Sequence, residues 1–318
     1  MRALVFAAAV LLATSAAAST QVHYVMGTFL RVDVDDDAPP AVFDECFARA
    51  RALDRTFSRF DPTSELVRLN ASAGGPVSPA FRAALDRALA LARTTDGAFD
   101  PSVGAVMALW RAPERPDASA IAAARRTVGR VAVDGDRVSL GPGTALDFDG
   151  FAKGVAVDAC VDALRAAGVT RALVSFGESS LYGLGAPRGK AAWTLDVRGP
   201  DPDVAVGRLA LRDRGAAVSA VFGGAGRRAH VVDPRTGALL HDAAASVIVA
   251  PTATDAEAWA KAVLVAGPAG VRDAERHGGV EAARLDRGGV AMGASMRAAR
   301  SLRTFDRPHA LGGEVALR

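Results

Sequence analysis

The sequence predicts one α+β domain built mainly from antiparallel strand pairs. Helical and strand-like patterns follow one another in irregular order, so the regular alternation of a doubly wound parallel sheet is not expected. The dipeptide Asp134-Gly135 between two short apolar runs is typical of a tight β-hairpin. No repeat, low-complexity tract or linker divides the sequence after its first residues. We therefore expect a single domain over residues 19–318.

Residues 1–18 have the composition of a secretory signal peptide. Arg2 precedes an apolar run over residues 3–13, and small residues follow up to Ser19. The run is too short for a membrane-spanning helix with its flanks, although the composition leaves an uncleaved N-terminal anchor open as an alternative. No cysteine lies near the expected cleavage site, so a lipid anchor is not expected. We expect an exported, periplasmic protein that is soluble after cleavage.

The composition is that of an ordinary globular protein. Hydrophobic residues make up 50 % of the chain, and 38 Lys and Arg nearly balance 35 Asp and Glu. Because the positive residues form no run of like charge, a nucleic-acid partner is not expected. Cys46 and Cys160 both fall on apolar faces of expected helices, without a CxxC motif or a histidine cluster. Two buried thiols are therefore expected in preference to a disulfide or a metal pair.

In the N-terminal half, periodicity and turn residues indicate the following elements. Residues 21–34 are expected to form a strand interrupted at Met26-Gly27-Thr28. A helix opens after Pro39 and Pro40, with an apolar stripe at Phe43, Cys46, Phe47, Ala50, Leu53 and Phe57. A short helix begins near Ser64, and longer ones follow over residues 78–94 and 117–128. Residues 130–133 and 137–140 are the two strands of the Asp134-Gly135 hairpin.

In the C-terminal half, apolar residues at helical spacing predict a helix from Gly154 to Gly168, where a glycine favours the left-handed C-terminal position. A strand over residues 172–176 follows. Further strands are expected at residues 193–197, 208–211, 217–221, 246–250, 281–285 and 290–292. Residues 251–264 are expected to be helical, with Thr254 and Glu257 as a capping box.

The stretch of residues 147–185 is the best candidate for a ligand site. Ala152-Lys153-Gly154 opens its helix, and a second loop with small side chains follows its strand. Such loops let phosphate groups approach backbone N–H groups, and Lys153 would add positive charge. The alternative is an ordinary turn, helix and strand with an exposed lysine.

Several loop motifs occur together in one order. They are Met26-Gly27-Thr28, Phe57-Ser58-Arg59-Phe60, Gly97-Ala98-Phe99-Asp100-Pro101, Ala152-Lys153-Gly154, Thr252-Ala253 and the segment from His230 through Asp233-Pro234-Arg235-Thr236-Gly237. As a set they resemble the ApbE family of flavin transferases. The resemblance implies a T-fold-like domain with mixed or antiparallel sheets that binds FAD and Mg²⁺ in a cleft. It also implies that FMN is attached to a Thr or Ser of a partner protein with release of AMP.

The resemblance assigns roles to residues that match the family motifs. The isoalloxazine ring would contact Met26 and stack on Phe60, and the adenosine end would lie at Asp100. Lys153 and Asp158 would support the diphosphate. His230 would assist deprotonation of the acceptor hydroxyl, with Asp233 beside it. The remaining candidates for the flavin nucleotide lie in two loops, and they are Gly177, Glu178, Arg235 and Thr236.

The sequence also departs from the family pattern at the expected metal site. The Ala152 backbone carbonyl and Glu257 would be ligands, but Lys261 stands where the family usually has a threonine. A protonated lysine has no lone pair for a metal ion, whereas Glu257 and Lys261 can form an i,i+4 ion pair. The Lys261 ammonium could therefore sit where Mg²⁺ is otherwise expected.

Two carboxylates stand where the family has bare backbone. Asp149 and Glu178 would repel a pyrophosphate unless Lys153 or Lys261 compensates them. A surface-facing Asp149 is the alternative. The leading hypothesis is an FAD:protein FMN transferase, for which a subunit of a membrane redox complex is one candidate acceptor. The alternatives are an FAD-binding or scavenging protein and an FAD pyrophosphatase.

Overall fold

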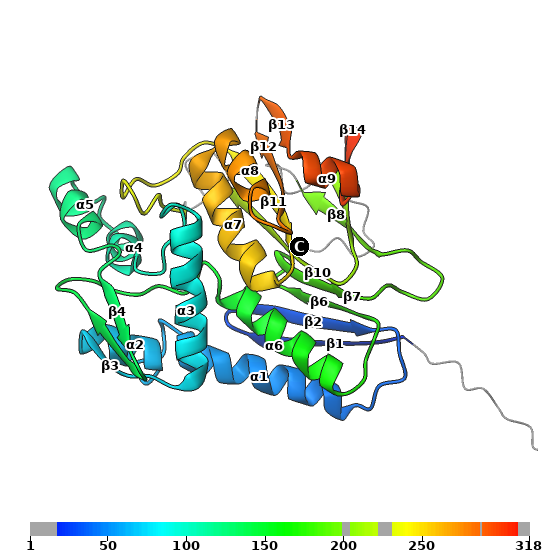
Figure 1. The fold of residues 1–318 in the computed structure, drawn as a ribbon, viewed down its shortest axis with the longest axis horizontal. Helices are drawn as coiled ribbons and strands as arrows, with labels where there is room; N and C mark the ends of the chain where they lie inside the picture. Colours follow the sequence, from blue (N-terminus) through cyan, green and yellow to red (C-terminus); the bar gives the residue numbers. More distant parts are fainter. Residues whose placement is uncertain (1–17, 199–203, 222–230, 287, 311–318) are drawn as a thin grey trace, which may run out of the picture.

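The computed structural model describes residues 18–198, 204–221, 231–286 and 288–310 (Figure 1). Residues 1–17 of the expected signal peptide, and His230, lie outside these ranges. Helices and strands are mixed along the chain, and the strand pairs of all three sheets are antiparallel. The predicted α+β class is therefore confirmed. Among the described helices, none is both long enough and apolar enough to cross a bilayer.

An eight-stranded sheet forms the centre of the fold. Its spatial order is β1-β2-β6-β7-β10-β11-β12-β13. The strands are β1 (Ser19–Val25), β2 (Thr28–Val34), β6 (Ala172–Phe176), β7 (Ser180–Leu184), β10 (Arg214–Val221), β11 (Ala244–Ala250), β12 (Glu281–Asp286) and β13 (Gly289–Met292). Every residue of β6, β7 and β11 is buried. These strands are therefore covered on both faces of the sheet.

A layer of helices covers one face of this sheet (Figure 1). It contains α1 (Ala41–Phe57), α6 (Ala152–Ala166) and α7 (Ala253–Ala266), with α3 (Pro79–Thr94) and α8 (Pro268–Glu275) beside them. The predicted stripe of α1, from Phe43 to Phe57, is buried in the main core. Helix α7 is buried over nearly its whole surface, because it packs on β10 and β11 and also against α6.

A second, three-stranded sheet covers the other face over strands β6, β7, β10, β11 and β12. Its order is β14-β9-β8, with β14 (Leu302–Ala310), β9 (Val204–Leu211) and β8 (Trp193–Arg198). Leu195, Leu209 and Leu211 from this sheet share an apolar cluster with Leu181 and Val247 of the large sheet. Helix α9 (Ala294–Ala299) adds Met296 to the same cluster. The described chain thus forms a helix layer, a large sheet and a small sheet.

The remaining elements lie at one side of the helix layer (Figure 1). They are α2 (Glu65–Ala71), α4 (Gly104–Arg111), α5 (Ala118–Arg125) and a small sheet of β3 (Gly74–Pro76), β5 (Arg137–Leu140) and β4 (Val131–Asp134). Side-chain caps begin three of the helices of this chain near the predicted points. Ser64, Ser78 and Asp117 accept hydrogen bonds from the first turns of α2, α3 and α5.

Two differences from the predicted elements have clear physical reasons. Residues 21–34 are not one interrupted strand, because Met26 and Gly27 both have positive φ and turn the chain back into a β1–β2 hairpin. Strand β7 was not predicted, because Ser180 and Gly183 weaken its apolar pattern. The intrinsic strand propensity of β7 is low, and the strand is stabilised by its neighbouring strands and by the layers on both faces of the sheet.

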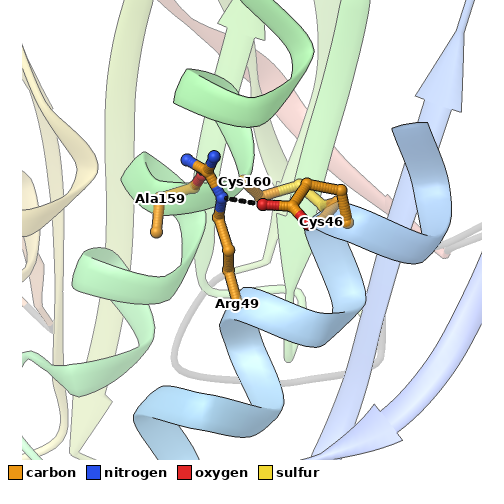
Figure 2. Close-up of a disulfide and its surroundings, with 5 residues drawn as sticks. Cys46, Arg49, Ala159 and Cys160 are labelled. Atoms are coloured by element: carbon orange, nitrogen blue, oxygen red, sulfur yellow. Dashed lines mark hydrogen bonds and ion pairs between the residues drawn. A yellow bond between two sulfur atoms is a disulfide. The ribbon is translucent and has the colours of Figure 1, made fainter. Parts of the chain in front are cut away.

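The expectation of two free thiols is wrong. Cys46 of α1 and Cys160 of α6 form a disulfide, with their Cα atoms 4.4 Å apart (Figure 2). The two cysteines are 114 positions apart in the sequence, so only the direct packing of α1 against α6 brings them together. The bond joins α1 to α6, the helix that begins with Ala152-Lys153-Gly154.

We expect the double substitution C46S/C160S to lower the free energy of unfolding by about 2–5 kcal/mol, because the disulfide closes a long loop in the unfolded chain. Urea unfolding of the variant and of the oxidised wild type measures the difference. Wild-type protein treated with a thiol reductant should approach the stability of the variant. Equal stability of all three samples would contradict a stabilising disulfide.

Candidate functional site

Two pockets at the edge of the helix layer share one lining residue, Asp149. The first, called here the α1 pocket, has a volume of about 320 Å³ and lies at the end of α1 beside the start of α6. The second, called the α4 pocket, has a volume of about 200 Å³ and lies beside α4. A ligand with two bulky ends and a linker could occupy both pockets, with its linker near Asp149.

The α1 pocket brings together residues from three segments. It is lined by Met26, Gly27, Asp54, Phe57, Ser58, Arg59, Phe60, Asp149, Ala152 and Lys153. The Met26 N–H donates to Oδ2 of Asp54 over 3.3 Å, which attaches the β1–β2 turn to α1. The Phe60 side chain is 76 % exposed, and the Arg59 guanidinium lies 3.8 Å from the centre of its ring. An exposed aromatic ring at a pocket mouth suits stacking on a flat ligand.

The α4 pocket has an apolar wall and a charged end. The wall includes Phe99, Val103, Met107, Val231 and Val232, and the charged end includes Arg111, Asp147, Asp149 and Lys261. Asp100, which also lines this pocket, accepts a 2.8 Å hydrogen bond from the Ser102 N–H and a 2.5 Å bond from its hydroxyl. Asp100 therefore shapes the loop at the pocket wall.

Asp149 joins two arginines between the pockets. Its Oδ2 accepts hydrogen bonds of 2.8 Å from Arg59 Nε and from Arg111 Nη2. Arg111 also pairs with Asp147, whose burial, together with the neighbouring Asp149 charge, raises the pKa of the Asp147 carboxyl. Asp149 thus faces the surface, with 46 % of its side chain exposed, and it is paired there with two arginines. The sequence had indicated lysines as its partners and had not indicated these arginines.

A buried carboxylate lies beside two lysines on the other side of the site. Glu257 of α7 is 1 % exposed and accepts a hydrogen bond from the Ser180 hydroxyl. Lys261 pairs with its Oε2, which confirms the predicted i,i+4 ion pair. Lys153 Nζ lies 3.6 Å from Oε1 of the same carboxylate. One carboxylate thus lies between two ammonium groups, one from each pocket lining.

Burial changes the proton affinity of both lysines. It lowers the pKa of Lys153 to about 8, while the Asp149 charge acts in the opposite direction. Burial, and then the nearby Lys153 charge, lower the pKa of Lys261 as well. The contact with the Glu257 carboxylate favours the protonated form of Lys261. An anionic ligand in the pockets would favour the charged form of both lysines for the same reason.

Asp158 belongs to α6, and its carboxylate binds the first turn of α7. Its carboxylate accepts bonds of 2.8 Å from the Ala253 N–H, 2.9 Å from the Thr254 N–H and 2.6 Å from the Thr254 hydroxyl. The N-cap of α7 is Thr252, which accepts from the Asp255 N–H. The predicted capping box of Thr254 and Glu257 is therefore wrong, because Glu257 points into the buried cluster instead.

Close packing of α6 on α7 also requires a glycine in the motif Ala152-Lys153-Gly154. A Cβ atom added to Gly154 would lie 2.6 Å from the Ala253 backbone oxygen. The start of α6, with Ala152 and Lys153, is thereby held directly against the start of α7. The sequence motif is explained as much by this packing as by any ligand.

The loop that follows His230 is ordered by its own side chains. Asp233 accepts hydrogen bonds from the Arg235 N–H at 2.9 Å and from its guanidinium, and the Thr236 hydroxyl accepts from the Ala238 N–H at 3.2 Å. These contacts make Asp233, Arg235 and Thr236 loop-shaping residues. Val231 and Val232 line the α4 pocket, so the chain reaches that pocket directly after His230.

The loop between β6 and β7 is attached to Lys153. Gly177 and Glu178 both have positive φ, which turns the chain sharply. The Lys153 ammonium donates to the Ser179 hydroxyl. The sequence had indicated Gly177 and Glu178, but Arg111, Ser179 and Ser180 were not predicted. Serines and arginines are common in this chain, and only the fold distinguishes these three.

Comparison with known proteins gives the same family as the motifs. The sequence matches the ApbE family over residues 26–300. The chain belongs to the ApbE family. An FAD:protein FMN transferase of Klebsiella pneumoniae (strain 342) is 30 % identical over 282 residues, covering 80 % of each chain. One of Treponema pallidum (strain Nichols) is 31 % identical over 288 residues, covering 78 % of each.

Solved structures of ApbE proteins have the same fold. The apo flavinyl transferase ApbE of Pseudomonas stutzeri superposes with a TM-score of 0.78 at 25 % identity, covering 89 % of this chain and 97 % of its own. The ApbE protein of Thermotoga maritima gives a TM-score of 0.80, also at 25 % identity, over 89 % and 99 %. The relatives are enzymes, and this ApbE protein is assigned to the same enzyme family.

The residues at the implied metal position do not fit Mg²⁺. Both oxygens of Glu257 are engaged, by Lys261 on one side and by Ser180 and Lys153 on the other. Mg²⁺ requires oxygen ligands in near-octahedral geometry, and an ammonium in contact with the carboxylate would repel it. Within the described ranges, no three His, Cys, Asp or Glu side chains are grouped for metal binding.

We expect D158N to lower the free energy of unfolding by about 1.5–3 kcal/mol, because the amide loses charge-assisted hydrogen bonds to the start of α7. Chemical unfolding measures the change. D162N on the exposed side of α6 is the matched control and should change stability by less than about 0.5 kcal/mol. A D158N variant with the stability of the wild type would show that Asp158 does not support the α6–α7 contact.

Proposed function

We propose that this ApbE protein is an FAD:protein FMN transferase, which attaches FMN from FAD to a Thr or Ser of a partner protein and releases AMP. The observation that carries the proposal is the pair of pockets that meet at Asp149, with Arg59, Arg111, Lys153 and Lys261 around the meeting point. Such a site suits a dinucleotide whose diphosphate lies between two ring systems. The named activity of the relatives supports the same reading.

The two pockets differ in a way that orients the substrate. The α1 pocket, with the exposed Phe60 ring and Met26, would take the isoalloxazine. The α4 pocket, with Phe99 and Asp100, would take the adenosine end. Lys153 would then lie between the two ends, within reach of the diphosphate.

The transfer exchanges the phosphoanhydride bond of FAD for a phosphoester bond to the acceptor. The acceptor hydroxyl oxygen attacks the phosphorus of the FMN half, and the bond from that phosphorus to the bridging oxygen breaks. AMP leaves with the electron pair, and the hydroxyl proton passes to His230. Negative charge increases on the phosphoryl oxygens as the bond breaks, so nearby cationic side chains would stabilise the transition state.

The proposed location is the periplasm, after removal of the signal peptide. The Cys46–Cys160 disulfide supports it, because disulfides persist mainly in oxidising compartments. A protein exported to that compartment could modify a periplasmic segment of a membrane redox complex, which is the acceptor class we favour. The partner is recognised through a Thr or Ser that must reach the phosphorus between the pockets.

The variant H230A should retain FAD binding but lose transfer by about 100-fold or more, because it lacks the proton acceptor. The assay incubates the mature protein with FAD and an acceptor domain that a related transferase modifies, and then measures flavin fluorescence of the acceptor after denaturing electrophoresis. A wild-type transfer rate in the H230A variant would contradict the assignment of His230 as the base.

The same samples separate the alternative functions. Release of AMP and free FMN without an acceptor would identify an FAD pyrophosphatase. Tight FAD binding with no product in any sample would identify a flavin-binding protein. Either result would overturn the transferase proposal.

The variant D149N should bind FAD roughly 5- to 30-fold more tightly, the equivalent of about 1–2 kcal/mol. Asp149 competes with the diphosphate for Arg59 and Arg111, and the neutral amide would compete less. Calorimetric titration with FAD at several salt concentrations measures the change, and the salt dependence should also become steeper. D162N is the control and should match the wild type. Weaker binding by D149N would mean that Asp149 is needed to orient the arginines.

A further inference from the structure

Lysine is rare in this chain, and its positions are informative. Only three of the 38 lysine and arginine residues are lysines: Lys153, Lys190 and Lys261. Lys190 is exposed in the turn after β7. The other two lie at the buried carboxylate of Glu257. In a chain that otherwise uses arginine for positive charge, two ammonium groups therefore converge on one point of the proposed site.

The different shapes of lysine and arginine side chains explain why an arginine would not fit beside Glu257. An ammonium is a compact point charge, whereas a guanidinium is a wide planar group. The Lys261 side chain on α7 is only 19 % exposed. Its place beside Glu257 is therefore suited to a small, spherical cation.

Lys261 also reaches the ligand side of the cluster. It lines the α4 pocket near Asp149, while Lys153 lines the α1 pocket. Within the described residues, one hydrogen bond of the Lys261 ammonium is seen, to Glu257. An ammonium has three N–H donors, so two of them can be directed to anionic oxygens in the pocket.

The contacts of Glu257 hold this cation in place. The carboxylate is fixed by the Ser180 hydroxyl from β7 and faces Lys153 from α6. Lys261 is one helical turn from Glu257 on α7, so backbone geometry keeps the two groups together. The cation is part of the chain and cannot be removed by a chelator.

We propose that the Lys261 ammonium takes the place of a divalent metal ion at the FAD diphosphate, so that this protein binds FAD without Mg²⁺. The inference rests on the proposed function and concerns the same site. Glu257, which would otherwise be a metal ligand, becomes the anchor of the ammonium. Lys153 and Lys261 then contact the diphosphate from the two pockets that meet at Asp149.

The test measures FAD binding by the full mature chain, using flavin fluorescence and calorimetry. Metal-stripped wild-type protein is titrated with FAD in EDTA and, separately, in millimolar MgCl₂. The expected dissociation constants agree within about twofold, since no metal site has to be filled. A wild-type protein that binds FAD at least tenfold more tightly with Mg²⁺ would overturn the proposal. This arm does not depend on the folding of any variant.

Variants at Lys261 test the position of the cation. K261M keeps the length of the side chain without its charge and should weaken FAD binding roughly 10- to 100-fold in EDTA. K190M removes the third lysine from an exposed turn and should bind FAD like the wild type. K261T supplies a hydroxyl beside Glu257, and its FAD affinity should rise when Mg²⁺ is added. A K261M protein with wild-type affinity, or a K261T protein indifferent to Mg²⁺, would contradict the proposal.

The transfer assay separates this inference from the proposed function. One outcome is FAD binding that needs no metal and is lost in K261M, with no transfer to any acceptor. This outcome would support the role of Lys261 and contradict the transferase function. The other outcome is transfer that occurs only with Mg²⁺, because FAD binding itself requires Mg²⁺. This outcome would support the transferase function and contradict the proposal that Lys261 replaces the metal ion.

Discussion

The ion-paired carboxylate of Glu257 is the interaction on which the rest of the site depends. A carboxylate that is 1 % exposed is stable only when other groups compensate for its lost hydration. Ser180, Lys153 and Lys261 supply that compensation from β7, α6 and α7. The same contacts fix the relative positions of two lysines that face different pockets. Stability of the core and geometry of the site are therefore coupled through one side chain.

The packing of α6 against α7 makes this cluster possible. Gly154 allows the helices to approach, and Asp158 binds the first turn of α7. The Cys46–Cys160 disulfide attaches the opposite side of α6 to α1, whose end forms the α1 pocket. Helix α6 is thus held on two sides. Lys153, in its first turn, is positioned by contacts that involve no ligand.

Local sequence signals predicted most of the helices and many strands. Some signals act within a single helix, so the fold does not change them. Examples are the apolar stripe of α1 and the capping residues Ser64, Ser78 and Asp117. Strand β7 was missed because its burial on both faces is decided by neighbours that lie far away in the sequence. The disulfide was missed for the same reason. Its cysteines carry no local spacing signal, and only the helix packing brings them together.

In the site, the motifs could be predicted from the sequence, but only the pairing within one helix could be. The spacing of Glu257 and Lys261 was enough to predict their ion pair, because both lie on one helix. Asp149 was indicated as an unusual acid, yet its partners Arg59 and Arg111 come from separate segments. The motif of Asp158 assigned this residue to the ligand but did not predict the hydrogen bonds by which its carboxylate binds the first turn of α7.

The two sides of the site hold their charges in different ways, and this difference has a consequence for binding. Arg59 and Arg111 share Asp149 at a partly exposed position, where a competing anion can replace the carboxylate. Lys153 and Lys261 share Glu257 in the protein interior, where the carboxylate cannot leave. An entering diphosphate would therefore displace Asp149 but add to the Glu257 cluster. The arginine side is the adaptable part of the site, and the lysine side is its fixed electrostatic centre.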